Sequence, residues 1–302
     1  MRNEVTRTFV VLNPVAGRAK GQENRQILER YFENHPGTVE FYETIGNEDL
    51  VAVVSAALER ACNLVVVVGG DGTLAGVAGA LVHTTVPLGI VPAGTGNGLA
   101  RGLGIPLDSN KAVALLVDQH KLRTIDVMQV QDRIFLLNVG VGLSAQAVSQ
   151  IAPEVKQRLG RSIYVWEIVK QLIGYQPRRF VLTVDGHRHR LRAAEVLIAN
   201  GLDIYTPRLD WGPAERFYDG KLDAYLIRAQ SVIDYLVLAG SILLRRGNRR
   251  SNRHLRYFAV HESIEVDAYQ TLPVEVDGDT IARTPIRVQI LPRALQVIVP
   301  PA

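Results

Sequence analysis

The sequence contains little cysteine and no long apolar run, and each absence excludes a class of protein. Cys62 is the single cysteine among 302 residues, so neither an internal disulfide nor a cysteine-rich metal cluster can form. No stretch reaches the ~18 apolar residues that a membrane-spanning helix requires, and the N-terminal residues lack the apolar run of a signal peptide. We therefore expect a cytoplasmic protein whose membrane contacts, if it makes any, are peripheral.

The motifs of several common enzyme classes are also missing. The seven histidines show no His-Glu-x-x-His spacing, which argues against a zinc hydrolase, and no serine stands in a Gly-x-Ser-x-Gly turn, which argues against a serine hydrolase. The composition is that of an ordinary globular protein, with 47% apolar and 21% charged residues and a net charge of +4. A length of 302 residues predicts roughly two domains of ~150 residues each.

The most informative stretch is an apolar strand that runs into a glycine turn. Residues Leu64 to Val68 are apolar and mostly β-branched, as in the centre of a parallel sheet, and a Gly-Gly-Asp-Gly turn at 69–72 follows at once. A helical pattern begins near Thr73. Because glycines let backbone N–H groups approach an anion and a helix N-terminus adds partial positive charge, this geometry predicts a phosphate site. Asp71 would repel a phosphate unless it holds a metal ion, orients a water molecule or meets a substrate hydroxyl. Ordinary turn glycines are the alternative interpretation at this point.

A second segment of the same kind follows. An apolar strand at 88–91 leads into Pro-Ala-Gly-Thr-Gly-Asn-Gly at 92–98, and a helical pattern restarts at Leu99. Two such units would place both turns at the carboxyl edge of one sheet. Neither turn is a Walker A loop, and the second does not read Gly-x-Gly-x-x-Gly, which disfavours a nicotinamide-type Rossmann site.

These two turns, with two further segments, resemble the diacylglycerol kinase catalytic domain family, which includes bacterial lipid kinases, sphingosine kinases and ceramide kinases. Asn-Pro-Val-Ala-Gly at 13–17 matches the family's Asn-Pro-x-Ser/Ala-Gly, and Asp-Gly-Asp at 277–279 matches its Asp-Gly-Glu. The four segments come in the family's order and span nearly the whole chain. The resemblance implies a lipid kinase that uses ATP and Mg²⁺ and transfers the γ-phosphoryl group to a hydroxyl of a diacylglycerol-like or sphingoid membrane lipid.

The order of predicted elements gives the fold class. Strand–helix alternation up to about residue 120 predicts an N-terminal parallel-sheet α/β nucleotide-binding domain, and the strand-rich remainder predicts a mainly antiparallel β-sandwich domain. We place the domains at 1–124 and 125–291, and the resemblance implies that 292–302 can return to complete the first domain. The expected elements include a helix that Asn47 caps, a helix within 162–173 and separate strands at 286–290 and 295–299.

The resemblance also implies roles for residues of both domains. The acidic residue that matches Asp279 is the family's proton acceptor, and Asp71 and Asp277 are the other catalytic candidates. A plain hairpin turn is the alternative interpretation of Asp277. Asp219 matches a segment that holds a structural Mg²⁺ in bacterial members, and a turn residue without metal is its alternative. The candidate nucleotide-binding residues are glycines, threonines and one asparagine: Asn13, Thr44, Gly69, Gly70, Gly72, Thr73 and Thr95.

Three positions depart from the family pattern. Gly76 stands where the family usually has glutamate, Gly98 where it usually has aspartate, and Asp279 where it has glutamate. These changes leave open a catalytically weakened, nucleotide-binding regulatory protein of the same fold. An NAD kinase is a further alternative, although the Asn-Pro start and the Asp-Gly-Asp end favour a lipid over NAD.

The final prediction from the sequence concerns partners. The segment 232–244 is mostly apolar but too short to span a bilayer, and a cluster of arginines follows it directly. This pattern predicts contact with an anionic membrane surface, and a solvated basic loop is the alternative. We expect a lipid substrate and no nucleic acid, and a homodimer remains open. The arginines expected at the membrane are Arg245, Arg246, Arg249 and Arg250.

Overall fold

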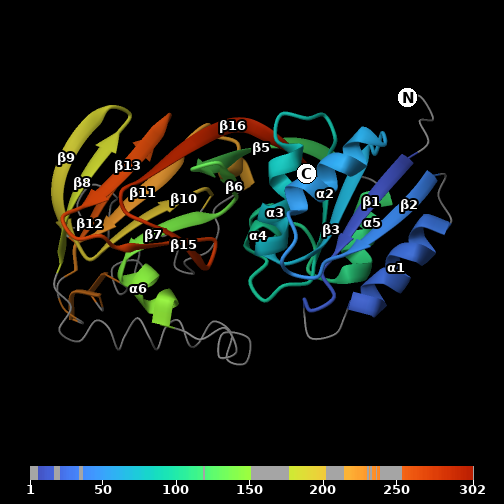
Figure 1. Cartoon of the computed structure of the whole chain (residues 1–302), viewed down its shortest axis with the longest axis horizontal. Helices are drawn as coiled ribbons and strands as arrows, with labels where there is room; N and C mark the ends of the chain where they lie inside the picture. Colours follow the sequence, from blue (N-terminus) through green and yellow to red (C-terminus); the bar gives the residue numbers. More distant parts are fainter. Residues whose placement is uncertain are drawn as a thin grey trace. The chain divides into compact units, whose positions relative to one another are not determined.

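The computed structural model divides into two compact units (Figure 1). Unit 1 comprises Met1–Val127 and Pro292–Ala302, and unit 2 comprises Met128–Leu291. The boundary expected from the sequence lay at 124. The structure describes residues 6–16, 21–33, 37–117, 120–150, 177–201, 214–229, 231, 233–235, 237–238 and 254–301.

Unit 1 is built on a parallel sheet, as predicted. The strands β1 (Thr6–Leu12), β2 (Gly37–Glu43), β3 (Leu64–Gly69) and β4 (Leu88–Pro92) pair in parallel in the order β2-β1-β3-β4. Every residue of β3 and β4 is buried, which explains their uninterrupted apolar runs. The helices of this unit are α1 (Gly21–Glu33), α2 (Leu50–Glu59), α3 (Asp71–Leu81), α4 (Gly98–Gly102) and α5 (Ser109–Val117).

Helix α2 begins later than the sequence pattern indicated. Its N-cap is Asp49, not Asn47, because the Asp49 carboxylate accepts hydrogen bonds from the backbone N–H groups of Val51 at 3.0 Å and Ala52 at 3.2 Å. Glu48 bends back to accept the N–H of Ile45 at 3.0 Å. Glu48 therefore closes the loop before the helix, and Asp49 caps the helix.

Unit 2 is mainly antiparallel, which confirms the predicted sandwich class. One sheet has the order β12-β11-β10-β7-β14-β15, and in the other the first part of β16 joins β13, β8 and β9 in antiparallel pairs (Figure 1). Among the residues described in this unit, helical structure occurs in α6 (Leu143–Gln150), in a short 3₁₀ turn at Ala214–Phe217 and at 233–235 and 237–238. Its strands are β6 (Arg133–Phe135), β7 (Asn138–Gly142), β8 (Arg178–Val184), β9 (His187–Ala193), β10 (Glu195–Ala199), β11 (Leu222–Ile227), β12 (Leu255–Val260), β13 (Ser263–Ala268), β14 (Pro273–Val276) and β15 (Asp279–Arg283).

Two strands belong to both units, β5 (Lys121–Val130) and β16 (Ile286–Val299). The first part of β16 pairs antiparallel with β13, and Val297 pairs in parallel with Leu88 of β4. The two separate strands that the sequence indicated are therefore one. Between its two parts, the N–H of Arg293 donates to Asp126 of β5 at 2.7 Å, so the chain stays paired where Pro292 interrupts the apolar pattern.

Some predictions fall on other parts of the chain. The sequence pattern did not indicate strands β12 and β15, and β15 has little apolar alternation because no residue in it is fully buried. The predicted helix at 162–173 lies outside the described residues, as do Arg245, Arg246, Arg249 and Arg250. Among the helices that the structure describes, none is both long and apolar enough to cross a membrane.

Candidate active site

A pocket of about 420 Å³ opens at the carboxyl edge of the parallel sheet in unit 1. Its walls are the loops that follow β1, β2, β3 and β4, so all four strands contribute to it. This is the edge at which open α/β sheets bind ligands. The residues that line it are Asn13, Val15, Ala16, Thr44, Gly46, Glu48, Leu50, Gly70, Gly72, Thr73, Gly94 and Thr95.

The two glycine turns contact each other directly. The N–H of Ala93 donates to the carbonyl of Gly69 at 2.9 Å, and a Cβ atom on Gly94 would lie 2.5 Å from the Cα atom of Gly70. A Cβ atom on Gly70 would lie 3.1 Å from the Cα atom of Gly94. Close packing of the two backbones therefore requires glycine at 94 and leaves little room for a side chain at 70. Gly72 differs, because a Cβ atom there would meet nothing within 4 Å.

Helix α3 presents its N-terminus to the pocket. Its N-cap is Gly70, whose backbone is extended and which offers no side chain to cap the helix, while Gly72 and Thr73 of the first turn line the pocket. The first N–H groups of a helix have no partner within it, and they carry partial positive charge. Among the described lining residues the one charged side chain is Glu48. Backbone N–H groups at the start of α3, and not the side chains of lysine or arginine among the described lining residues, therefore make this pocket suitable for an anion.

Asn13 joins the first loop to this helix. Its side-chain amide donates to the hydroxyl of Thr73 at 3.1 Å, and its carbonyl oxygen accepts the N–H of Val15 at 3.1 Å. The backbone N–H of Thr44, in the next loop, donates to Leu12 at 2.9 Å. The Thr73 hydroxyl accepts the hydrogen bond from Asn13, and its own proton can still be donated to a ligand.

Asp71 bonds to the backbone of the second glycine turn. Its two carboxylate oxygens accept the N–H groups of Gly98 at 3.0 Å and Leu99 at 3.3 Å, at the start of α4. The residue at the N-cap position of α4, Asn97, has a left-handed backbone (φ 50°) and makes no cap of its own, since its side chain bonds to Gly94. Asp71 thus fixes the two turns relative to each other, and a direct role in chemistry stays a prediction.

In unit 2, Asp277 lies in the two-residue turn between β14 and β15 and has φ 49°, as hairpin turns of this kind require. Its carboxylate accepts three backbone N–H groups, from Leu136 and Leu137 at 3.0 Å each and from Asn138 at 2.8 Å. It therefore ties the hairpin to the segment between β6 and β7. This geometry favours a structural role for Asp277.

Asp279 is the first residue of β15 and is exposed to solvent. The turn before it is held at two points, because Asp277 bonds to the neighbouring segment and Glu275 accepts the N–H of Gly278 at 2.5 Å. Of the three catalytic candidates, Asp279 alone presents its carboxylate at an exposed position on a fixed turn. Its role as proton acceptor stays a prediction.

The sequence pattern gave no indication of a pair of buried carboxylates in the six-stranded sheet. Glu195 on β10 and Glu275 on β14 flank Gly140 on the strand between them, and a Cβ atom on Gly140 would lie 2.7 Å from Glu275 Oε2 and 3.2 Å from Glu195 Oε1. Burial raises the pKa of each carboxyl to about 7, although Ser144 donates its N–H at 2.8 Å and its hydroxyl to Glu195. The signal that could have indicated them is glycine inside a strand, which marks close approach.

The residues around Asp219 do not fit a Mg²⁺ site. Lys221 lies 3.5 Å from both Asp219 and Asp223, and Arg216 and the Tyr257 hydroxyl bond to Asp223 at 3.0 and 2.7 Å. Burial raises the pKa of Asp219, whereas the charge of Lys221 lowers it. Lys221 and Arg216 already neutralise the two carboxylates. Mg²⁺ needs several oxygen ligands, and the described residues contain no group of three or more His, Cys, Asp or Glu side chains that could hold a metal ion. We therefore route no step through a metal.

The structure thus brings some of the predicted residues together and leaves others apart. Six of the seven candidate nucleotide-binding residues line the pocket, and Gly69 ends the strand just before it. Asp71 belongs to the same unit, whereas Asp219, Asp277 and Asp279 belong to unit 2. Glu48 and Gly94 also line the pocket and were not among the candidates.

The chain thus combines an α/β unit, which has a glycine-lined pocket at its sheet edge, with a mainly antiparallel sandwich unit. Residues 7–130 match the family described as the diacylglycerol kinase catalytic domain, and residues 138–299 match the YegS C-terminal NAD kinase beta sandwich-like domain. The chain belongs to the family of the YegS C-terminal NAD kinase beta sandwich-like domain, and with the match to the diacylglycerol kinase catalytic domain at 7–130 it is a lipid kinase.

Relatives match along almost the whole chain. A protein of Mycobacterium tuberculosis named diacylglycerol kinase is 27% identical, and the match covers 99% of this chain and 97% of that protein. A Bacillus subtilis protein of the same name is 24% identical over 97% of this chain and 96% of its own. A solved diacylglycerol kinase structure from Bacillus anthracis has a TM-score of 0.73 and 18% identity, and it covers 100% of this chain and 99% of that one.

Proposed function

We propose that this lipid kinase transfers the γ-phosphoryl group of ATP to a hydroxyl of a diacylglycerol-like or sphingoid membrane lipid. The observation that carries the proposal is the pocket of about 420 Å³ at the N-terminus of α3, whose walls are glycine-rich backbone. The names of the M. tuberculosis and B. subtilis relatives support the choice of a diacylglycerol-like acceptor.

Phosphoryl transfer depends mostly on positioning and on charge stabilisation. In the proposed complex the nucleotide phosphates accept hydrogen bonds from the backbone at 70–73, and the hydroxyls of Thr73 and Thr95 add donors. Asn13 orients the Thr73 hydroxyl through the 3.1 Å bond. Asp71 acts as a positioning residue, since its bonds to Gly98 and Leu99 hold the second turn against the first.

The lipid hydroxyl is a poor nucleophile until its proton has an acceptor. We assign this role to Asp279, whose carboxylate takes the proton as the oxygen attacks the γ-phosphorus. Support comes from its exposed position on a turn that Glu275 and Asp277 hold in place. The Asp279 side chain is one methylene shorter than the glutamate of the family pattern. Its carboxylate therefore reaches the lipid hydroxyl either directly or through one water molecule.

The test is an assay of the purified protein with labelled ATP and Mg²⁺, against a panel of diacylglycerols and sphingoid bases, with NAD in parallel. Labelled lipid supports the proposal, whereas labelled NADP would replace it by an NAD kinase. Nucleotide binding without any product would identify a regulatory protein that has lost turnover. That second candidate rests on Gly76 and Gly98, where the family carries acidic residues.

A further inference from the structure

One face of the sheet that β16, β13, β8 and β9 form in unit 2 carries a concentration of arginines. On the edge strand β9, Arg188, Arg190 and Arg192 alternate with inward residues and are all exposed. In the pairing register, Arg192 lies opposite Arg179 on β8, and Arg287 lies on the same face of β16. We call these five residues the arginine face.

The five arginines make few contacts within the protein: Arg287 donates a hydrogen bond to the Ser263 hydroxyl at 3.4 Å, and Arg179 lies near the ring of Tyr269. No ion pair involving any of them occurs in the described part of the chain. The acidic side chains on the same face are Glu265 and Asp267 of β13, so positive charge exceeds negative charge there. Arg188, Arg287 and these two carboxylates lie around a shallow hollow of about 430 Å³.

Protection of an edge strand against aggregation explains some of this charge, because natural sheets often place basic residues on their edges. That explanation covers β9 alone. It does not account for Arg179 on β8 or Arg287 on β16, which are inside the sheet. Binding of a large anionic partner across the sheet would explain the arginines on all three strands.

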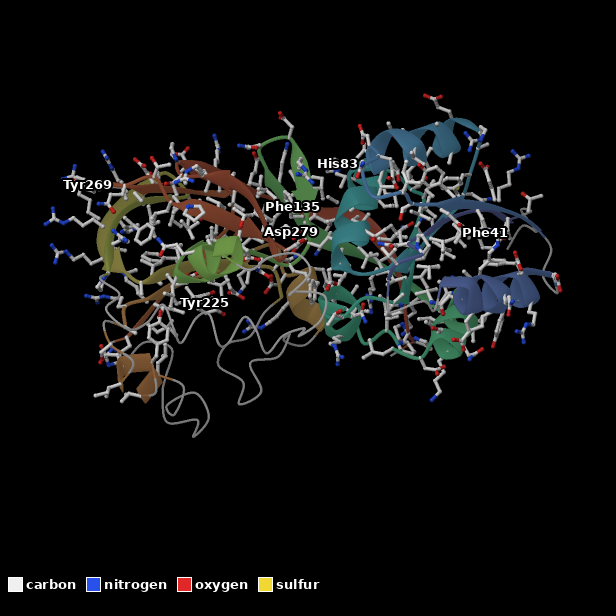
Figure 2. The ribbon with its side chains drawn as sticks, turned by 60° about the horizontal axis from the view of Figure 1, so that its bottom comes forward. Phe41, His83, Phe135, Tyr225, Tyr269 and Asp279 are labelled. Carbon is white, nitrogen blue, oxygen red and sulfur yellow. The ribbon has the colours of Figure 1, made fainter. Side chains whose placement is uncertain are left out.

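An exposed tyrosine lies at one end of the arginine face. Tyr269 is 74% exposed, its N–H donates to the carbonyl of Arg179 at 3.3 Å, and the Arg179 guanidinium lies 5.9 Å from its ring centre. Figure 2 shows Tyr269 among protruding nitrogen-tipped side chains of unit 2. Tyrosine beside basic residues is typical of protein surfaces that lie at the headgroup level of a bilayer.

We propose that the arginine face, with Tyr269, docks unit 2 on the anionic surface of a lipid bilayer. This inference rests on the proposed function, in which a membrane lipid accepts the phosphoryl group. A nucleic acid would satisfy the same charges, but the exposed tyrosine at the end of the arginine face suits a headgroup layer better than a phosphate backbone. The surface is distinct from the predicted arginine cluster at 245–250.

The test is sedimentation of the purified full chain with vesicles of phosphatidylcholine alone and of equimolar phosphatidylcholine and phosphatidylglycerol. The Arg188→Gln, Arg190→Gln, Arg192→Gln triple variant should bind the anionic vesicles more weakly by on the order of 100-fold at low salt. A matched control removes three exposed cationic side chains from unit 1 through Arg7→Gln, Lys111→Gln and Lys121→Gln, and it should bind like the unmodified protein.

A triple lysine variant at the β9 positions keeps the charge and should retain most of the binding, which also guards against a folding defect in the glutamine variant. Equal loss in the glutamine variant and the unit 1 control would overturn the proposal, as would unchanged binding in the glutamine variant. Arginine-dependent capture of duplex DNA without vesicle binding would assign the face to nucleic acid. Kinase activity towards a short-chain diacylglycerol in detergent micelles is measured in parallel. Absence of that activity would contradict the proposed function, whereas the vesicle result would still test the docking proposal.

Discussion

The carboxylate of Asp279 is the single side chain on which the proposed chemistry depends most. Replacement by asparagine preserves the shape and removes the basic oxygen, so we expect kcat to fall by ~10²–10⁴-fold while the Kd for ATP hardly changes. Steady-state kinetics with the lipid acceptor and calorimetric titration of ATP measure the two quantities. Asp279→Glu serves as the control and should remain active. Turnover like that of the unmodified protein in the asparagine variant would remove Asp279 from the mechanism.

Gly72 provides a cleaner probe of the pocket than its neighbours do. A Cβ atom at Gly72 meets nothing within 4 Å, so Gly72→Ala should leave the Tm of the free protein nearly unchanged. Its methyl group would lie where phosphates need the backbone, so the rise of Tm with ATP and Mg²⁺ should be largely lost. Gly94→Ala is the contrasting variant, because its Cβ atom would lie 2.5 Å from Gly70 and should destabilise the free protein. A full ATP-induced rise in Gly72→Ala would argue against the phosphate site.

At the scale of elements, the pairing of β10, β7 and β14 confines two carboxylates beside one glycine. Burial raises the pKa values of Glu195 and Glu275 to about 7, so the folded protein holds protons that the unfolded chain has released. Stability should therefore fall as the pH rises from about 4.5 through 7, and it should level off above that. In Glu195→Gln the amide oxygen can accept the Ser144 N–H while the amide nitrogen donates to the Ser144 hydroxyl, so the variant should raise Tm near pH 8 and flatten this dependence. Denaturation curves across the pH range measure it.

The control for that experiment is Glu262→Gln, which changes an exposed glutamate in the same unit. It should leave the pH dependence of stability as it is in the unmodified protein. If Glu195→Gln lowers Tm at every pH, the carboxylate contributes hydrogen bonds that outweigh its cost of burial.

The hairpin of β14 and β15 depends on Asp277. Asp277→Asn turns one of the carboxylate oxygens into an amide donor, so at least one of three backbone N–H groups loses its acceptor, and we expect the free energy of unfolding to fall by ~1–3 kcal/mol. Because this turn carries Asp279, kcat should fall as well, with ATP affinity retained. Chemical denaturation and kinetics distinguish this result from that of Asp279→Asn, which should lower kcat without loss of stability.

At the scale of the whole molecule, strand β16 makes the stability of one unit depend on the other. Leu295 is fully buried in the part of β16 that belongs to unit 1, and Leu295→Ala should lower the free energy of unfolding by ~2–5 kcal/mol. Since the strand continues into unit 2, we expect fluorescence and circular dichroism to report one coincident transition. Gln289→Ala, at an exposed position of the same strand, should change stability by less than ~0.5 kcal/mol. Two separate transitions, of which only one moves, would contradict this expectation.

The sequence predicted the parts of the molecule that depend on local pattern. The buried runs at β3 and β4 and the glycines that end them indicated a parallel sheet with a pocket at its carboxyl edge, because both signals lie within a few residues of each other. Most of the candidate nucleotide-binding residues line that pocket for the same reason.

The features that the sequence did not predict depend on contacts between distant segments. Asp71 bonds to Gly98, Asp277 bonds to Asn138, and Glu195 and Glu275 meet across Gly140. Nothing near these residues in the chain indicates such partners. The continuity of β16 was missed for a related reason, because pairing with β5 and β4 overrides the break at Pro292.

The return of β16 to β4 has a consequence for synthesis on the ribosome. Residues 1–127 emerge first, yet the sheet of unit 1 lacks the strand that covers β4 until residues 292–299 have been translated. Throughout that interval β4, which is entirely apolar and buried in the finished protein, has an open edge of the kind that invites pairing with other chains. While that edge is open, every residue that lines the pocket has already been translated, and translation of residues 292–299 supplies the strand that closes the edge.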